Sequence, residues 1–123
     1  SSVWQEQKPV DFHNLPLLHA EVEHRHWVNQ VEQWLRGEID SLPALQASHC
    51  KVGRWIENDG QDRFLNNSVL TKLMIHHERL HRAGEQAVDA RARGDEQAVH
   101  ESLSAMYEYR DNVLSTLRLL ERD

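Results

Sequence analysis

The stretch SVLTKLMIHHERLHRAGEQAVDARARG, residues 68–94, decides the fold of this chain. Its apolar side chains recur at steps of three and four residues, which is the spacing of one face of an α-helix. Asn67 or Ser68 is a suitable helix start, and Gly94 is a typical stop. The sequence therefore predicts one long helix whose apolar face carries Val69, Leu70, Leu73, Leu80, Ala87 and Val88, with His77 and His81 among them.

Two further segments show the same helical spacing. Pro16 suits the first turn of a helix because its missing N–H needs no partner there, and the pattern that follows ends at Gly37. Asp95 is a typical N-cap, and the pattern after it continues to the end of the sequence. The apolar positions of these two predicted helices are Leu17, Ala20, Trp27, Val28, Val31, Trp34 and Leu35 in the first, around His24, and Val99, Leu103, Met106, Val113, Leu114, Leu117 and Leu120 in the second.

The region between these helices is less regular. Pro43 opens a short turn or helix, and Ser48 is a suitable N-cap for a second short helix through Ile56, which Asn58-Asp59-Gly60 then breaks. Four helices with short connections predict an all-α fold, an antiparallel four-helix bundle with one short extra helix or turn. We expect the bundle to span residues 16–123 after an N-terminal extension of residues 1–15.

The composition supports helices and excludes several functional classes. Glycine and proline number only 5 and 3 among 123 residues, which argues against a sheet with many tight turns. The net charge of −6 is the opposite of what a nucleic-acid-binding protein carries. One cysteine cannot form an internal disulfide, so we expect a reducing, cytoplasmic location. No apolar run approaches the ~18 residues of a membrane span, so no membrane insertion is expected.

Nine histidines are the unusual feature of the composition, and two of them form a pair. His77 and His81 are four residues apart, so they lie one above the other on the same helix face. This is the spacing at which a helix presents two imidazoles to one metal ion. A buried histidine bonded to a backbone carbonyl is the alternative interpretation of each.

Two other residues complete a possible ligand set. His24 lies within the apolar face of the first helix, where an unpartnered imidazole would waste its polar nitrogens. Cys50 lies near the start of the short helix predicted from Ser48 to Ile56, and a helix N-terminus favours the thiolate form of a cysteine. Three nitrogens and one sulfur make a complete tetrahedral shell for Zn²⁺. A small buried hydrophobe is the alternative for Cys50 alone.

At these residues the sequence resembles the chemoreceptor zinc-binding (CZB) domain family. His24-Arg25-His26-Trp27 matches its first motif, HxxW, and Ser48–Ile56, SHCKVGRWI, resembles its central HxCxxGxW signature. His77–His81 supplies the closing HxxxH, so that the resemblance spans roughly residues 20–85. It implies His24, Cys50, His77 and His81 as zinc ligands, close helix approach at Gly53, and packing by Trp27 and Trp55.

The resemblance also implies a biological role. Its members are cytosolic sensor modules of bacterial chemoreceptors or diguanylate cyclases, and residues 105–110 onward look like the version that precedes a cyclase domain. The domain itself would be no enzyme, and a fused or adjacent signalling domain would provide the output. Zinc occupancy, or oxidation of Cys50, would alter the packing of the helices. A homodimer is expected, with Trp4, Trp34 and Leu119 as apolar positions for its surface.

Competing functions rest on the same residues. His77-Glu78-x-x-His81 is a literal HExxH, the zinc-protease motif, with Glu78 as general base and Glu101 as a candidate third ligand. A closed shell with His24 and Cys50 would leave no open position for the water that catalysis needs. A metal-free helical interaction module is a second alternative. A di-iron site is disfavoured because it requires several inward glutamates.

The remaining histidines have less specific predictions. His13, His19, His26 and His100 are expected at the surface. Spacing alone leaves open whether His49 and His76 lie beside the site or at its mouth.

Overall fold

A computed structural model describes residues 15–47, Cys50 and residues 68–121 of the chain. The regular structure in this part consists of three long helices: α2 (Leu15–Leu35), α5 (Ser68–Arg93) and α6 (Glu96–Glu121). The predicted all-α fold is thereby confirmed as three helices that pack together. The short helix predicted from Ser48 to Ile56 lies outside the described residues except for Cys50, as do residues 1–14 of the predicted extension.

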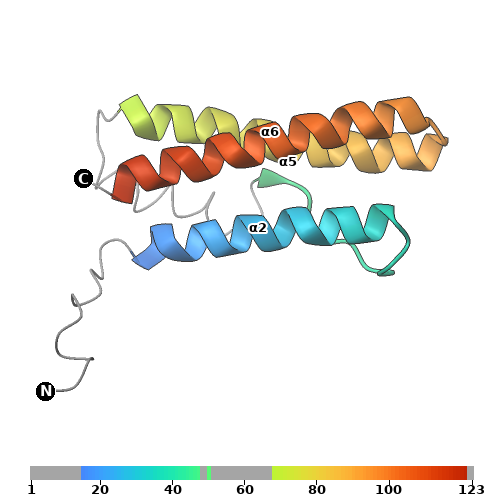
Figure 1. Ribbon diagram of the computed structural model, residues 1–123, viewed down its shortest axis with the longest axis horizontal. Helices are drawn as coiled ribbons and strands as arrows, with labels where there is room; N and C mark the ends of the chain where they lie inside the picture. The colour runs from blue at the N-terminus through green and yellow to red at the C-terminus, as the bar shows by residue number, and fades with distance from the viewer. Residues whose placement is uncertain (1–14, 48–49, 51–67, 122–123) are drawn as a thin grey trace, which may run out of the picture.

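The three helices lie side by side with their axes roughly aligned (Figure 1). α5 and α6 form an antiparallel hairpin, and α2 runs in the same direction as α5 and opposite to α6. The contact between α5 and α6 is by far the most extensive, that between α2 and α6 is smaller, and that between α2 and α5 is the smallest. Among the three described helices, α2 therefore has the least contact with the other two.

Glycines end α2 and α5 at the positions the sequence predicted. Gly94 has a positive φ of 73°, a backbone conformation that residues with a Cβ rarely adopt. Its N–H donates to the Arg91 carbonyl, and the N–H of Asp95 donates to the Ala90 carbonyl, which together form a Schellman motif. Gly37 ends α2 with the same pair of hydrogen bonds.

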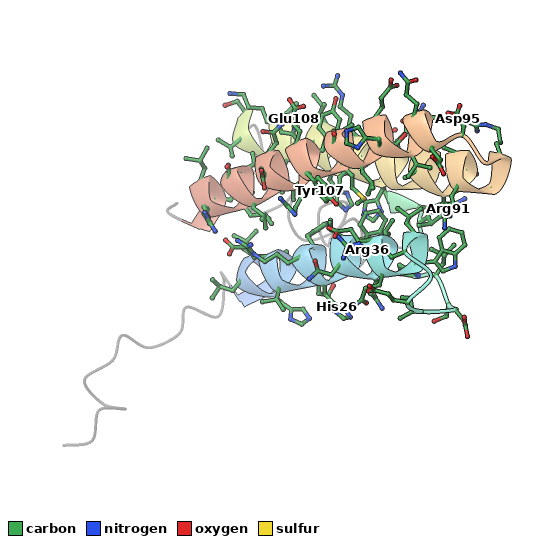
Figure 2. All side chains as sticks on the ribbon, turned by 45° about the vertical axis from the view of Figure 1, so that its right-hand side comes forward. His26, Arg36, Arg91, Asp95, Tyr107 and Glu108 are labelled. Atoms are coloured by element: carbon green, nitrogen blue, oxygen red, sulfur yellow. The ribbon has the colours of Figure 1, made fainter. Side chains whose placement is uncertain are left out.

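Asp95 joins α5 to α6 without an intervening loop. While its N–H closes the end of α5, its side-chain Oδ1 accepts a hydrogen bond from the Ala98 N–H at 3.1 Å. Asp95 is therefore the N-cap of α6, as predicted. Figure 2 shows it at the turn of the hairpin.

The core forms where the apolar faces of the three helices meet, and the predicted periodicity is confirmed in each helix. α5 also buries small residues at Ala83, Gly84 and Ala90, which the apolar pattern did not single out. The largest fully buried apolar side chains are Leu17, Val28, Val31, Leu73, Leu80, Met106, Val113, Leu117 and Leu120.

Polar contacts add to the packing between α6 and α2. Tyr107 lies on the side of α6 that faces α2 (Figure 2), close to the Glu32 carboxylate. Burial and the negative charge of Glu32 raise the pKa of Tyr107. Nearer the other end of α2, Arg118 forms an ion pair with Glu21 at 3.5 Å. Among the helices described, none is long and apolar enough to span a bilayer.

Candidate metal centre

Three helical histidines and Cys50 converge on one point in the interior. α2 contributes His24, α5 contributes His77 and His81, and Cys50 follows the segment that leaves the end of α2. One potential ligand atom from each of the four residues lies within 4.8 Å of the other three. In a tetrahedral site with ordinary zinc bond lengths, neighbouring N and S ligand atoms are about 3.4–3.6 Å apart. The cluster therefore has nearly the dimensions of a zinc shell.

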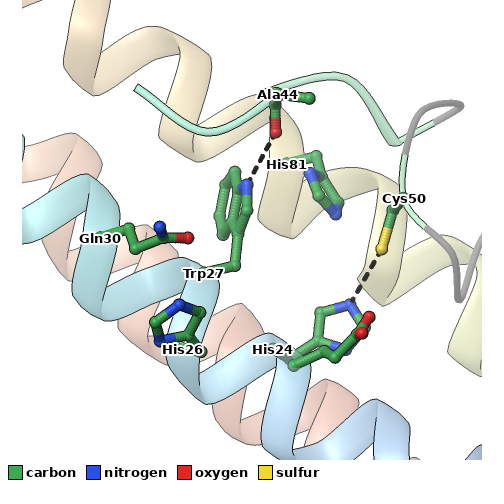
Figure 3. A pocket seen from close by; sticks show the side chains of 8 residues that line it. His24, His26, Trp27, Gln30, Ala44, Cys50 and His81 are labelled. Atoms are coloured by element: carbon green, nitrogen blue, oxygen red, sulfur yellow. Dashed lines mark hydrogen bonds between the residues drawn. The ribbon is translucent and has the colours of Figure 1, made fainter. Parts of the chain in front are cut away.

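The histidine rings meet edge to face around this point. Ring centroids are 5.1 Å apart for His24 and His77, and 4.6 Å apart for His77 and His81. The Cys50 Sγ is 3.9 Å from the Nε2 of His24, and Figure 3 shows these two groups facing each other. The structure thus brings together all four residues that the sequence predicted as ligands.

Backbone carbonyls fix the orientation of two of the rings. The Nδ1–H of His24 donates to the Ala20 carbonyl, and the Nδ1–H of His81 donates to the Leu45 carbonyl, each at 2.8 Å. Because Nδ1 carries the proton in both rings, the Nε2 lone pair of each is left for the site. This is the arrangement in which proteins hold metal-binding histidines.

Two buried nitrogens in the cluster lack hydrogen-bond partners. They are the Nε2 atoms of His77 and His81, whose side chains are almost fully buried. A buried polar atom without a partner costs about 1–3 kcal/mol, and a bound cation removes that cost. The donor set and these unpartnered atoms therefore fit Zn²⁺.

Burial keeps the three imidazoles neutral. It lowers the pKa of His77 to about 2, with further lowering by the nearby His81 and His24. Burial also lowers the pKa of His81 to about 4, although its hydrogen bond to Leu45 opposes this shift. Burial lowers the pKa of His24 against the opposing influence of the Ala20 carbonyl and of Glu23. Neutral imidazoles are the protonation state that metal binding requires.

A cavity of about 230 Å³ lies beside the cluster (Figure 3). His24, Cys50 and His81 form part of its wall, and Trp27 forms another part. The Trp27 indole N–H donates to the Ala44 carbonyl at 2.8 Å. The other lining residues are Glu23, His26, Gln30 and Ala44.

The other histidines fall into distinct environments. His19, His26 and His100 are exposed, as predicted, and His19 pairs with Glu23 at 2.9 Å. His76 is half-buried and its ring lies 6.4 Å from that of Tyr109 on α6. His13 and His49 lie outside the described residues.

The two glutamates of the hydrolase alternative, Glu78 and Glu101, do not join the cluster. Glu78 is exposed, whereas His77 and His81 on the same helix are buried. Glu101 is also exposed and accepts a hydrogen bond from Gln97. Within the described part of the chain, the group suited to a metal ion consists of His24, Cys50, His77 and His81.

Sequence reasoning missed the backbone groups that orient the site. The Ala20 carbonyl was within reach of prediction, because it lies one helical turn before His24. The carbonyls of Ala44 and Leu45 belong to an irregular segment, and no residue type signals their role.

Helices that deliver three buried imidazoles and a thiol to one point define a small helical metal-binding domain. The family model of the chemoreceptor zinc-binding domain, CZB, matches residues 24–88, more than half of the 123 residues, and the chain belongs to this family. The match and the cluster together identify a Zn²⁺ site. They also make this a binding and sensory domain rather than a catalytic one. Searches of curated proteins and of solved structures found no match.

Proposed function

We propose that this chain is a zinc-responsive regulatory domain of a cytoplasmic bacterial signalling protein, with His24, Cys50, His77 and His81 as the four zinc ligands. The observation that carries the proposal is the pair of buried, unpartnered Nε2 atoms of His77 and His81, which lie in one cluster with His24 and Cys50. The family match supports a role in signalling.

The regulatory part of the proposal rests on where the ligands come from. His77 and His81 belong to the α5–α6 hairpin, whereas His24 belongs to α2 and Cys50 to the segment that follows it. Bound zinc would hold these parts together, and structural zinc in small domains has an apparent binding free energy of about 10–16 kcal/mol. The α2–α5 contact is the smallest between the three helices, so a zinc ion bound by ligands from both of them would have a large effect on their packing.

α6 is the element suited to pass a change onward. It approaches α2 where Tyr107 lies close to Glu32, and it approaches α5 where the Tyr109 ring lies 6.4 Å from that of His76, which directly precedes His77. Movement at the metal centre therefore reaches α6 by two routes. Oxidation of Cys50 would act on the same zinc-mediated link between the helices, because it weakens one of the four ligands.

The output and the assembly are further parts of the proposal. A diguanylate cyclase is one candidate output, from the sequence likeness of residues 105–110 onward, and a chemoreceptor is the other, from the family description. The domain would act as a homodimer. Leu119 is 45% exposed and Trp34 is half-buried, which leaves apolar surface on α6 and α2 for a second copy, whereas Trp4 lies outside the described residues.

Metal analysis and hydrogen exchange test this function. The purified chain is expected to hold about one zinc per chain, and Cys50→Ala to lose most of it, while the exposed control His100→Ala keeps it. Addition of zinc to the chelated protein should slow amide exchange in α2 and α5. A chain without metal binding refutes the zinc assignment, and identical exchange with and without zinc refutes the regulatory role.

A further inference from the structure

Trp27 makes two contacts that both affect the position of His81, one with the Ala44 carbonyl and one with the His81 ring itself. Its indole N–H holds the Ala44 carbonyl at 2.8 Å, and the next carbonyl, that of Leu45, accepts the Nδ1–H of His81 at 2.8 Å. The ring of His81 in turn packs against the Trp27 indole, with ring centroids 4.4 Å apart. Two contacts therefore fix the orientation of the His81 ring: the hydrogen bond to Leu45, whose neighbour Ala44 is bonded to Trp27, and the packing against the Trp27 indole.

Gly84 provides the space that this arrangement needs. It is buried on α5, one turn after His81. A Cβ at this position would lie 2.5 Å from the Cη2 of Trp27 and 3.3 Å from its Cζ2 and Cζ3. Real Cβ atoms do not approach a ring atom to 2.5 Å, so any residue other than glycine displaces the indole. The indole has little freedom to move aside, because its other edge is bonded to Ala44.

We infer that Trp27 and Gly84 are positioning residues of the zinc site, which set the orientation of His81 and the spacing of α2 and α5 before metal binds. This inference rests on the proposed function and extends it to two residues that donate no ligand. Rigid placement of a ligand before binding raises affinity, because less ordering has to occur on binding. Because the Trp27 indole is hydrogen-bonded to Ala44, movement of residues 44–45, which lead to Cys50, would also displace Trp27.

A double-mutant cycle on the full chain tests the inference. Gly84→Ala should weaken zinc binding at least tenfold, although alanine is the better helix former. Trp27→Phe, which removes the distal ring and the indole N–H, should also weaken it at least tenfold. In the Trp27→Phe background, Gly84→Ala should change affinity less than twofold, because the space of the distal ring is then free. This loss of the Gly84→Ala effect separates direct contact from two independent defects.

The controls use the same helices. Trp34→Phe removes an indole from α2 outside the site, and Gln86→Ala changes an exposed residue on the same turn of α5 as Gly84. Both should keep wild-type zinc affinity. Circular dichroism of each metal-free variant verifies folding. In the Co²⁺-substituted protein, the visible d–d bands should shift in Trp27→Phe and remain in place in Trp34→Phe, which distinguishes an altered ligand geometry from general loss of stability.

The possible results are distinct. Wild-type zinc affinity in folded Gly84→Ala overturns the inference, as does an equal Gly84→Ala effect in both backgrounds. Should Gly84→Ala not fold, the decision passes to Trp27→Phe, whose unchanged affinity and Co²⁺ spectrum overturn the inference. A wild-type chain that binds no zinc instead refutes the proposed function.

Discussion

His77 differs from an ordinary buried histidine in what its ring nitrogens contact. A core histidine typically satisfies its polar atoms with carbonyls or hydroxyls, whereas the buried Nε2 of His77 has no hydrogen-bond partner. The same is true of the Nε2 of His81, although its Nδ1 is bonded to Leu45. These side chains are arranged for metal binding at the expense of the stability of the metal-free fold.

Replacement of His77 by leucine should therefore separate stability from function. His77→Leu is expected to abolish tight zinc binding and to increase the free energy of unfolding of the metal-free protein by about 1–2 kcal/mol, because a buried unsatisfied nitrogen is removed. Urea denaturation in the presence of a chelator measures the change. The exposed control His100→Leu should stay within about 0.5 kcal/mol of wild type. A strongly destabilised His77→Leu would contradict this account.

Much of the site was predictable at this scale, and the reason is helical geometry. His24, His77 and His81 share faces with buried leucines and alanines, so the three- and four-residue spacing sufficed to select them. Gly84 was not selected, because a glycine within a helical pattern carries no sign of what approaches it. Its role depends on a contact with Trp27, more than fifty residues earlier in the sequence.

At the scale of elements, the ends of the helices followed from their capping residues. The predicted ends of α2 and α5 and the predicted start of α6 agree with the structure to within one or two residues, because Gly37, Gly94 and Asp95 each have a local physical role. Residues 51–67 lie outside the described part, so the predicted helix end at Asn58-Asp59-Gly60 stays a prediction. The side-by-side arrangement of α2 and α5 depends on long-range packing and did not follow from local signals.

The junction between α5 and α6 offers a direct test. Asp95→Ala removes the side-chain acceptor for the Ala98 N–H and should lower the free energy of unfolding by about 1 kcal/mol. Urea denaturation of the metal-free protein measures this loss. Glu108→Ala, an exposed change in the middle of α6, is the matched control and should have little effect. An unchanged stability of Asp95→Ala would show that the cap contributes nothing.

At the scale of the whole molecule, the buried histidines couple folding to pH. Unfolded histidines titrate near pH 6.5, whereas the pKa values of His81 and His77 in the fold lie at about 4 and about 2. The unfolded chain therefore binds more protons than the folded chain in the range below pH 6.5. The stability that these neutral histidines contribute to the metal-free fold is fully present above pH 6.5 and is lost as the pH falls toward these lower values.

This gives a prediction for the metal-free protein. Between pH 6.5 and pH 5, each histidine that stays neutral in the fold should lower the free energy of unfolding by about 2 kcal/mol. Urea denaturation at several pH values, with a chelator present, measures the slope. His77→Leu should make the slope shallower, because one of the titrating groups is gone. The same slope in both proteins would show that His77 does not contribute.

Asp95 has a consequence for which part of the domain can move. Because one residue both closes α5 and caps α6, the backbone of the junction is hydrogen-bonded to both helices, and we expect α5 and α6 to move together as one arm. A change in the position of His77 or His81 is then not expected to alter how α5 and α6 pack against each other. Under the proposed function, we expect such a change to appear as a movement of α2 against this arm, at the small surface where α2 and α5 touch. Residues inserted next to Asp95 would make the α5–α6 junction flexible, and we expect them to uncouple the movement of α6 from that of the metal site.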